Sequence, residues 1–167
     1  MLECEFVQID YNGISGARDK RNLEHTEAYS LLDKMLKAHG VSEYEISRNE
    51  NGKPYIDGSD IHFSISHTEG LCAVALSDTP IGIDCEKINS AYEGKIDNFS
   101  KRYFLPSEQN EIEKSENRLL KFFEIWTRKE AYIKKHGLNS GEIAKVDTTS
   151  LKYETVWHGD YIITIFK

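Results

Sequence analysis

Residues 119–135, LLKFFEIWTRKEAYIKK, decide the fold because they predict one long amphipathic helix. Apolar side chains form a stripe with helical spacing: Leu119, Phe123, Trp126 and Ile133. Glu130 falls on the same stripe, where a carboxylate is costly unless it is paired or binds a metal. Lys129 is its neighbour and Lys134 follows one turn later, within reach of its carboxylate. The helix therefore carries a charged group that needs a partner.

A second acidic feature lies in the predicted strand 81–86, Ile-Gly-Ile-Asp-Cys-Glu. Asp84 and Glu86 project from one face of this strand, with backbones about 6–7 Å apart. Neighbouring carboxylates repel unless a cation bridges them, and oxygen ligands with open positions suit Mg²⁺ and substrate phosphates. The alternative is a solvated edge strand, which this pattern alone would favour. With Glu130 also lacking a partner, a magnesium site becomes the preferred interpretation.

The remaining pattern predicts an α+β fold with antiparallel strands packed on helices. Apart from the helix that ends near Gly137 (118–136), the predicted helices are 23–38, 96–104 and 107–114, and the predicted strands are 3–9, 61–66, 71–76, 81–86, 150–157 and 160–166. Strand 71–76 is apolar on both faces and is predicted to be central. The three adjacent strands from 61 to 86 predict one antiparallel sheet. The order of elements predicts two small lobes, residues 1–87 and 88–167.

Composition narrows the class of protein. The 167 residues carry a formal net charge of −7, which argues against non-specific nucleic-acid binding. Three scattered cysteines, Cys4, Cys72 and Cys85, form no metal motif and indicate reduced thiols. The sequence shows no apolar leader and no stretch that would span a membrane. We therefore expect a cytoplasmic protein.

Shorter motifs are weaker signals. His67, after Ser66, would be able to donate to a phosphate oxygen, although a hydrogen-bonded turn histidine is favoured from these residues alone. A Ser–His nucleophile pair is poorly supported, because adjacent residues in a strand point to opposite faces. Gly52-Lys53-Pro54 is also readable as a turn that enters a strand. The segment 13–22 is polar and predicts a loop, and it holds a basic cluster of Arg18, Lys20 and Arg21.

Taken together, these segments resemble the 4'-phosphopantetheinyl transferase superfamily. The matching motifs occur in the family's order: Gly-Lys-Pro at 52–54, Phe-Ser-Ile-Ser-His at 63–67, Gly-Ile-Asp-Cys-Glu at 82–86 and Trp-Thr-Arg-Lys-Glu-Ala-Tyr-Ile-Lys-Lys-His-Gly at 126–137. The resemblance implies two similar α+β lobes in a pseudo-twofold arrangement, with the coenzyme A site between them. Within the superfamily, the sequence resembles the larger, monomeric type, with a shortened C-terminal half. Tyr29 stands where larger members carry an arginine for the 3'-phosphate, and Arg18, Lys20 or Arg21 are the proposed substitutes.

The resemblance implies Mg²⁺-dependent transfer of 4'-phosphopantetheine from coenzyme A to a serine of an apo acyl or peptidyl carrier protein, releasing adenosine 3',5'-bisphosphate. The implied roles are Mg²⁺ ligation by Asp84, Glu86 and Glu130, leaving-group assistance by Lys134, an adenine pocket of Gly52, Lys53 and Pro54, phosphate binding by Ser66 and His67, and coenzyme A binding by Lys129. Glu130 and a metal-bound water both remain candidates for the general base. The alternatives are a non-catalytic binder of coenzyme A or a carrier protein, and another Mg²⁺-dependent phosphoryl-transfer enzyme, although no P-loop pattern is present.

Overall fold

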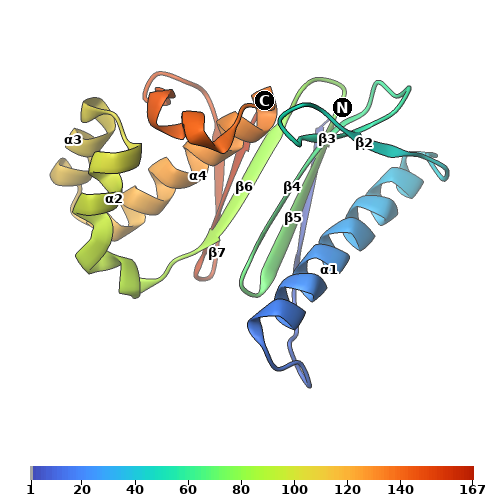
Figure 1. The fold of residues 1–167 in the computed structure, drawn as a ribbon, viewed down its shortest axis with the longest axis horizontal. Coiled ribbons are helices and arrows are strands. Elements are labelled where there is room, and N and C mark those ends of the chain that lie inside the picture. The colour runs from blue at the N-terminus through green and yellow to red at the C-terminus, as the bar shows by residue number, and fades with distance from the viewer. Residues whose placement is uncertain (1) are drawn as a thin grey trace.

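The computed structural model describes residues 2–167 and has the predicted α+β fold (Figure 1). The elements follow in the order β1 (Leu2–Gln8), α1 (Ala17–Ala38), β2 (Ile46–Arg48), β3 (Pro54–Ile56), β4 (His62–Thr68), β5 (Leu71–Ser77), β6 (Gly82–Lys87), η1 (Ser90–Lys95), α2 (Ile96–Tyr103), α3 (Pro106–Lys114), α4 (Arg118–His136), η2 (Ser140–Lys145), β7 (Glu154–His158) and β8 (Tyr161–Phe166).

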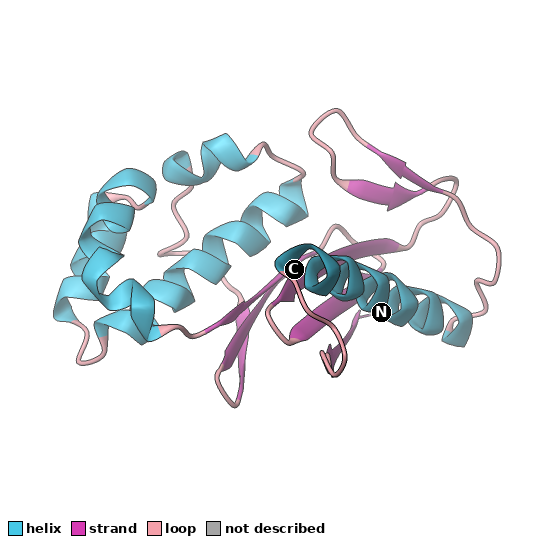
Figure 2. Cartoon of the chain, turned by 60° about the horizontal axis from the view of Figure 1, so that its bottom comes forward, coloured by secondary structure: helices cyan, strands magenta, loops and turns pink. Residues whose placement is uncertain are grey.

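The chain repeats one topology twice. In the first half, β1 is followed by α1 and the hairpin β4–β5, and the sheet order is β1-β5-β4. In the second half, β6 is followed by α4 and the hairpin β7–β8, and the sheet order is β6-β8-β7. All of these pairs are antiparallel. Figure 1 shows the long strands between α1 on one side and α2, α3 and α4 on the other, and Figure 2 shows the short β2–β3 hairpin set apart from them.

The pairing of β6 concerns the predicted boundary between the two lobes. The sequence predicted that strand 81–86 joins the two strands before it, which is wrong, because β6 pairs with β8. The partner strand lies more than seventy residues later, so local spacing gave no sign of it. The predicted lobe boundary after residue 87 stays a prediction, and this pairing favours a boundary before Gly82 instead.

Strand β5 lies at the centre of the molecule, as its apolar sequence predicted, and all seven of its residues are buried. Cys72, Val74 and Leu76 face α1 and share its core. Leu71, Ala73 and Ala75 face the second sheet and pack against residues such as Ile83 and Ile163. The alternation of a strand thus puts one set of side chains into each of two cores.

A row of hydroxyl groups joins the two halves. Backbone N–H groups of β6 that point away from β8 would be unsatisfied at a sheet edge. Hydroxyls on β4 accept from them in register, and the pairs are Ile83 to Ser64 (3.0 Å), Cys85 to Ser66 (3.2 Å) and Lys87 to Thr68 (3.3 Å). The alternating polar face of β4 is therefore the seam between the halves, and it fixes β4 beside the acidic face of β6.

Strand β6 also packs closely against α4. A side chain at Gly82 would place its Cβ 1.9 Å from the carbonyl oxygen of Ala131 and 2.6 Å from the backbone nitrogen of Lys135. Both are backbone atoms of α4, so they cannot rotate aside. Glycine at this position thus permits the approach that brings the acidic strand against the helix that carries Glu130.

One helix boundary differs from the prediction. Helix α1 begins at Ala17 rather than near Leu23, so the basic cluster of Arg18, Lys20 and Arg21 lies in its first turns and not in a loop. These turns are exposed or only partly buried and have no apolar stripe, which is why helical periodicity did not reveal them. Within residues 2–167, the helices lack the length and apolar character that a transmembrane span requires.

Candidate active site

The polar centre of the molecule lies where β4, β6 and α4 meet. The ammonium group of Lys134 lies 2.7 Å from Oδ1 of Asp84 and also donates to Oγ of Ser66 at 2.8 Å. The Ser66 hydroxyl in turn donates to the same Asp84 oxygen at 2.8 Å. Burial alone would lower the pKa of Lys134, but the charge and hydrogen bond of Asp84 outweigh it and raise that pKa. Lys134 therefore stays protonated beside a buried carboxylate.

The negative charge of Asp84 affects the pKa of two further carboxylates. Burial first, and then Asp84, raises the pKa of Glu86 to about 7. The same two causes raise the pKa of Glu130 above its ordinary value. The second oxygen of Asp84, Oδ2, is buried and accepts no hydrogen bond from any of the described residues. The three acidic residues predicted to act together are therefore coupled electrostatically, with Asp84 in the middle.

This chemistry suits a divalent cation, although the site is not arranged as a closed metal cage. Among residues 2–167, no group of three or more His, Cys, Asp or Glu side chains is arranged to hold a metal ion. The donor set nevertheless fits Mg²⁺, which prefers carboxylate oxygens and keeps several positions for water and phosphate. A cation would satisfy the free oxygen of Asp84 and relieve the repulsion that raises the pKa of Glu86. The assignment of Mg²⁺ to these residues stays a prediction.

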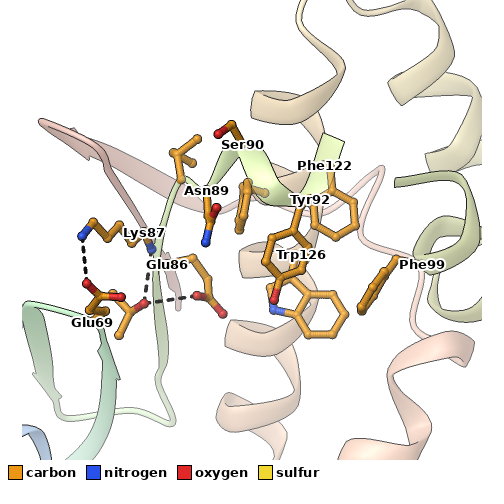
Figure 3. Close-up of a pocket in the computed structure, with 12 residues that line it drawn as sticks. Glu69, Glu86, Lys87, Asn89, Ser90, Tyr92, Phe99, Phe122 and Trp126 are labelled. Carbon is orange, nitrogen blue, oxygen red and sulfur yellow. Dashed lines mark hydrogen bonds and ion pairs between the residues drawn. The ribbon is translucent and has the colours of Figure 1, made fainter. Parts of the chain in front are cut away.

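Residues of the polar centre contribute to the walls of two cavities. The smaller, of about 230 Å³, is lined by Gly52, Lys53 and Pro54, by residues of β4, and by Lys134 near the end of α4. The larger, of about 470 Å³, is lined by Glu86 and by aromatic side chains of the second half (Figure 3). Each cavity is thus lined by one residue of this centre, the smaller by Lys134 and the larger by Glu86.

The turn that contains Gly52-Lys53-Pro54 contacts the C-terminal end of α4. Nζ of Lys53 donates to the carbonyl of Lys135 at 2.6 Å, and the amide of Asn51 donates to the carbonyl of Gly137 at 2.8 Å. These carbonyls have no partner within the helix, so the turn satisfies them. Burial, followed by the nearby charge of Lys135, lowers the pKa of Lys53 to about 8. The turn thus fixes the helix end that bears Lys134, in addition to lining the smaller cavity.

His67 lies at the outer end of β4, and its position leaves its predicted role untested. Nδ1 of its ring lies 3.3 Å from a carboxylate oxygen of Glu24 in α1. The hydroxyl of Tyr11 also donates to Glu24, and the ammonium group of Lys20 lies over the Tyr11 ring at 4.8 Å. His67 thus contacts an acidic residue of α1, and Lys20 lies over the tyrosine that donates to the same carboxylate. Phosphate binding by His67 stays a prediction.

Sequence reasoning missed one basic residue near Tyr29. The guanidinium of Arg48 donates to the Tyr29 hydroxyl at 3.3 Å and to the carbonyl of Gly52 at 2.8 Å. It lies beside the position where the resemblance leads one to expect an arginine. No local pattern marked Arg48, because the contact depends on how the β2–β3 hairpin folds over α1.

Lys129 was predicted to bind coenzyme A, and in the structure it forms a buried ion pair. Its side chain is fully buried, its ammonium group lies 2.6 Å from Glu108, and it also donates to the carbonyl of Val146 at 2.6 Å. Glu108 is equally buried and accepts from the backbone of Leu105 and from Thr148. This arrangement ties α3, α4 and the segment after η2 together, and it favours a structural role for Lys129 over the predicted contact with coenzyme A.

Comparison with known proteins agrees with this geometry. A sequence model described as the 4'-phosphopantetheinyl transferase superfamily matches residues 80–165, just over half of the chain. The chain belongs to that superfamily. The matched range contains β6 and α4 entirely, and so contains every acidic residue of the polar centre.

Individual members of the superfamily are also similar to this one. The chain is 39% identical over 115 residues to 4'-phosphopantetheinyl transferase gsp of Aneurinibacillus migulanus, covering 64% of this chain and 46% of that protein. It is 35% identical over 127 residues to a 4'-phosphopantetheinyl transferase of Bacillus subtilis, covering 73% and 54%. It is 34% identical over 124 residues to 4'-phosphopantetheinyl transferase AcpT of Salmonella typhi, covering 71% and 64%. The chain thus spans roughly half to under two thirds of these relatives.

Proposed function

We propose that this protein transfers 4'-phosphopantetheine from coenzyme A to a serine of an apo acyl or peptidyl carrier protein, with Mg²⁺ as cofactor. The observation that carries the proposal is the cluster of Asp84, Glu86, Glu130 and Lys134 on β6 and α4, in the segment matched by the superfamily. Relatives that carry the name 4'-phosphopantetheinyl transferase support it.

The reaction moves one phosphoryl-linked group. The serine hydroxyl of the carrier attacks the β-phosphorus of coenzyme A, and its proton passes to a base. A new O–P bond forms while the bond from that phosphorus to the bridging oxygen breaks, and adenosine 3',5'-bisphosphate leaves. Bound Mg²⁺ would neutralise charge on the pyrophosphate, and Asp84, Glu86 and Glu130 are the residues that would hold it.

Lys134 suits stabilisation of the leaving group. It remains protonated because Asp84 raises its pKa, and its side chain is about 30% exposed, on the wall of the smaller cavity. A fixed cation aimed at developing negative charge is worth more in the transition state than in the substrate complex. Glu130 is a candidate for the base, since burial and then Asp84 raise its pKa above the ordinary value of a glutamate.

The competing proposal is a protein that binds coenzyme A without transferring any group. A binder needs the cavities but has no use for a strained acidic cluster, so the repulsion around Asp84 argues for transfer. The deciding experiment incubates the protein with coenzyme A, Mg²⁺ and a panel of apo carrier proteins, and reads intact masses. A carrier that gains one phosphopantetheine, and not when its acceptor serine is replaced by alanine, supports transfer. Coenzyme A binding without any mass gain across the panel supports the binder.

A further inference from the structure

Strand β7 is an open edge of the second sheet. The strand order β6-β8-β7 leaves β7 paired on one side only, with β8. Within residues 2–167, no backbone hydrogen bond joins β7 to any segment other than β8. The outer edge of such a strand presents N–H and C=O groups that another strand can pair with. β7 is therefore available for the addition of a further strand.

Exposed apolar side chains gather at this edge. Among the side chains that the structure describes, four large apolar ones are exposed, and two of them, Val156 (42%) and Trp157 (47%), lie on β7. A third, Phe6 of β1, has its ring 4.9 Å from the ring of His158 at the end of β7. Val156 and Trp157 point to opposite faces of the sheet, because they are adjacent in a strand. A strand alongside β7 would therefore cover apolar surface on both faces.

The sequence of β7 is complementary to itself when two copies run antiparallel about Val156. This register sets Glu154 of each copy opposite His158 of the other, where an imidazole N–H can donate to the carboxylate. It also sets Thr155 opposite Trp157, a pair of β-branched and aromatic side chains of the kind that stabilises sheets. All five residues of the strand thus find a matching partner in a second copy.

The charges just beyond the strand fit the same register. Charged residues beside an edge usually keep other strands away. Here Lys152 and Asp160 are exposed and lie two residues before and two residues after β7, so the twofold axis brings opposite charges together. Centring the pair on Trp157 instead would set Glu154 opposite Asp160, and like charges directly opposite destabilise a pair. Centring it on Thr155 would set Glu154 opposite an apolar residue.

We propose that β7 joins two copies of this chain by antiparallel pairing with itself about Val156. The two three-stranded sheets then form one continuous six-stranded sheet. A second copy fits better than an unrelated strand, because a twofold axis requires a surface that matches itself, as the order of charges here does. β8 separates β7 from β6, so the contact does not use the polar centre and does not depend on the proposed function. This state differs from the monomer that the resemblance implies.

Sedimentation equilibrium over a series of protein concentrations tests the pairing. The average mass of wild type is expected to rise from that of one chain to that of two, because a contact through a five-residue strand is smaller than a typical permanent interface. Val156→Lys puts two ammonium groups at the twofold axis and is expected to raise the dissociation constant of the dimer at least about tenfold. Because Val156 is exposed, its variant should keep the wild-type circular dichroism and urea midpoint.

A charge swap tests the register. Lys152→Asp sets two carboxylates opposite each other across the axis and is expected to raise the dissociation constant about threefold or more. The double variant Lys152→Asp/Asp160→Lys restores opposite charges and is expected to return it to within about twofold of wild type. The matched control is Lys101→Asp, which changes the net charge equally at an exposed position of α2 and should pair like wild type.

Four outcomes overturn the proposal. The first two are the mass of a single chain at every concentration, and a dimer that Val156→Lys leaves intact. The third is a dimer that Lys152→Asp weakens but the double variant does not restore, since the register would then be wrong. The fourth is a protein that stays monomeric alone but forms a one-to-one complex with an apo carrier protein that is lost in Val156→Lys, which would assign this edge to the carrier.

Discussion

Replacing Glu86 by glutamine should change how the stability of the protein depends on pH. Burial and Asp84 raise the pKa of Glu86 from 4.5 to about 7 in the folded protein. The folded protein therefore keeps this proton at pH values where the unfolded chain has lost it. Wild-type protein without metal should lose stability as the pH rises from about 4.5 to about 7, whereas glutamine, which is always neutral, removes that loss.

The size of the effect follows from the pKa. At 1.36 kcal/mol per pH unit, a pKa of about 7 instead of 4.5 corresponds to about 3 kcal/mol, an upper limit because water reaches part of the side chain. Glu86→Gln should match wild type near pH 4 and be more stable by up to about 3 kcal/mol above pH 7.

Urea unfolding in chelator at a series of pH values measures this difference. Glu93→Gln, at an exposed position, is the control and should follow wild type throughout. Saturating Mg²⁺ should stabilise wild type more at pH 7.5 than at pH 5, because carboxylates must lose their protons to bind it. Parallel stability curves for wild type and Glu86→Gln from about pH 4 to about pH 8 would refute the reasoning.

Three other substitutions test different parts of the account. Gly82→Ala should destabilise the fold by about 3 kcal/mol or more, because its Cβ would lie 1.9 Å from the Ala131 carbonyl oxygen; wild-type urea midpoints would contradict the close packing of β6 on α4. His67→Ala should weaken coenzyme A by about tenfold or more but dephospho-coenzyme A far less, since a charged hydrogen bond is worth about 1.5–3 kcal/mol; equal losses by calorimetry would remove His67 from 3'-phosphate binding. Lys129→Met should cost about 3–5 kcal/mol by leaving Glu108 buried without its partner, and the folded protein should keep the wild-type KM for coenzyme A; a raised KM at unchanged stability would restore the binding role.

Periodicity predicted most of the fold. The stripe from Leu119 to Ile133 predicted a helix at 118–136, and α4 has those bounds. The strand 71–76, apolar on both faces, proved central because each face meets a different core. Such patterns report burial, and burial repeats with the period of the element that carries it.

The wrong predictions have two causes. The start of α1 has no apolar stripe, and the pairing of β6 with β8 joins segments far apart in the chain. The coenzyme A contact of Lys129 stays a prediction, but its ion pair with Glu108 had no sequence signal, because Glu108 lies on another helix. The grouping of Asp84, Glu86 and Glu130 was predicted because an acidic residue on a core-facing stripe implies a partner, and the structure couples these residues through their charges. The β6–β8 pairing and the Lys129–Glu108 ion pair, by contrast, left no local signal in the sequence.

The measurement that tests the central claim most directly compares two neighbouring lysines. Lys134 contacts Asp84, whereas Lys135 lies over the ring of Phe166. Single-turnover transfer from coenzyme A to an apo carrier protein, read by intact mass, should be slower by at least about 10²-fold in Lys134→Ala, and coenzyme A affinity should fall much less. Lys135→Ala should transfer at close to the wild-type rate. Near-normal transfer by Lys134→Ala, or equal losses in both variants, would contradict the assignment of this centre to phosphopantetheine transfer.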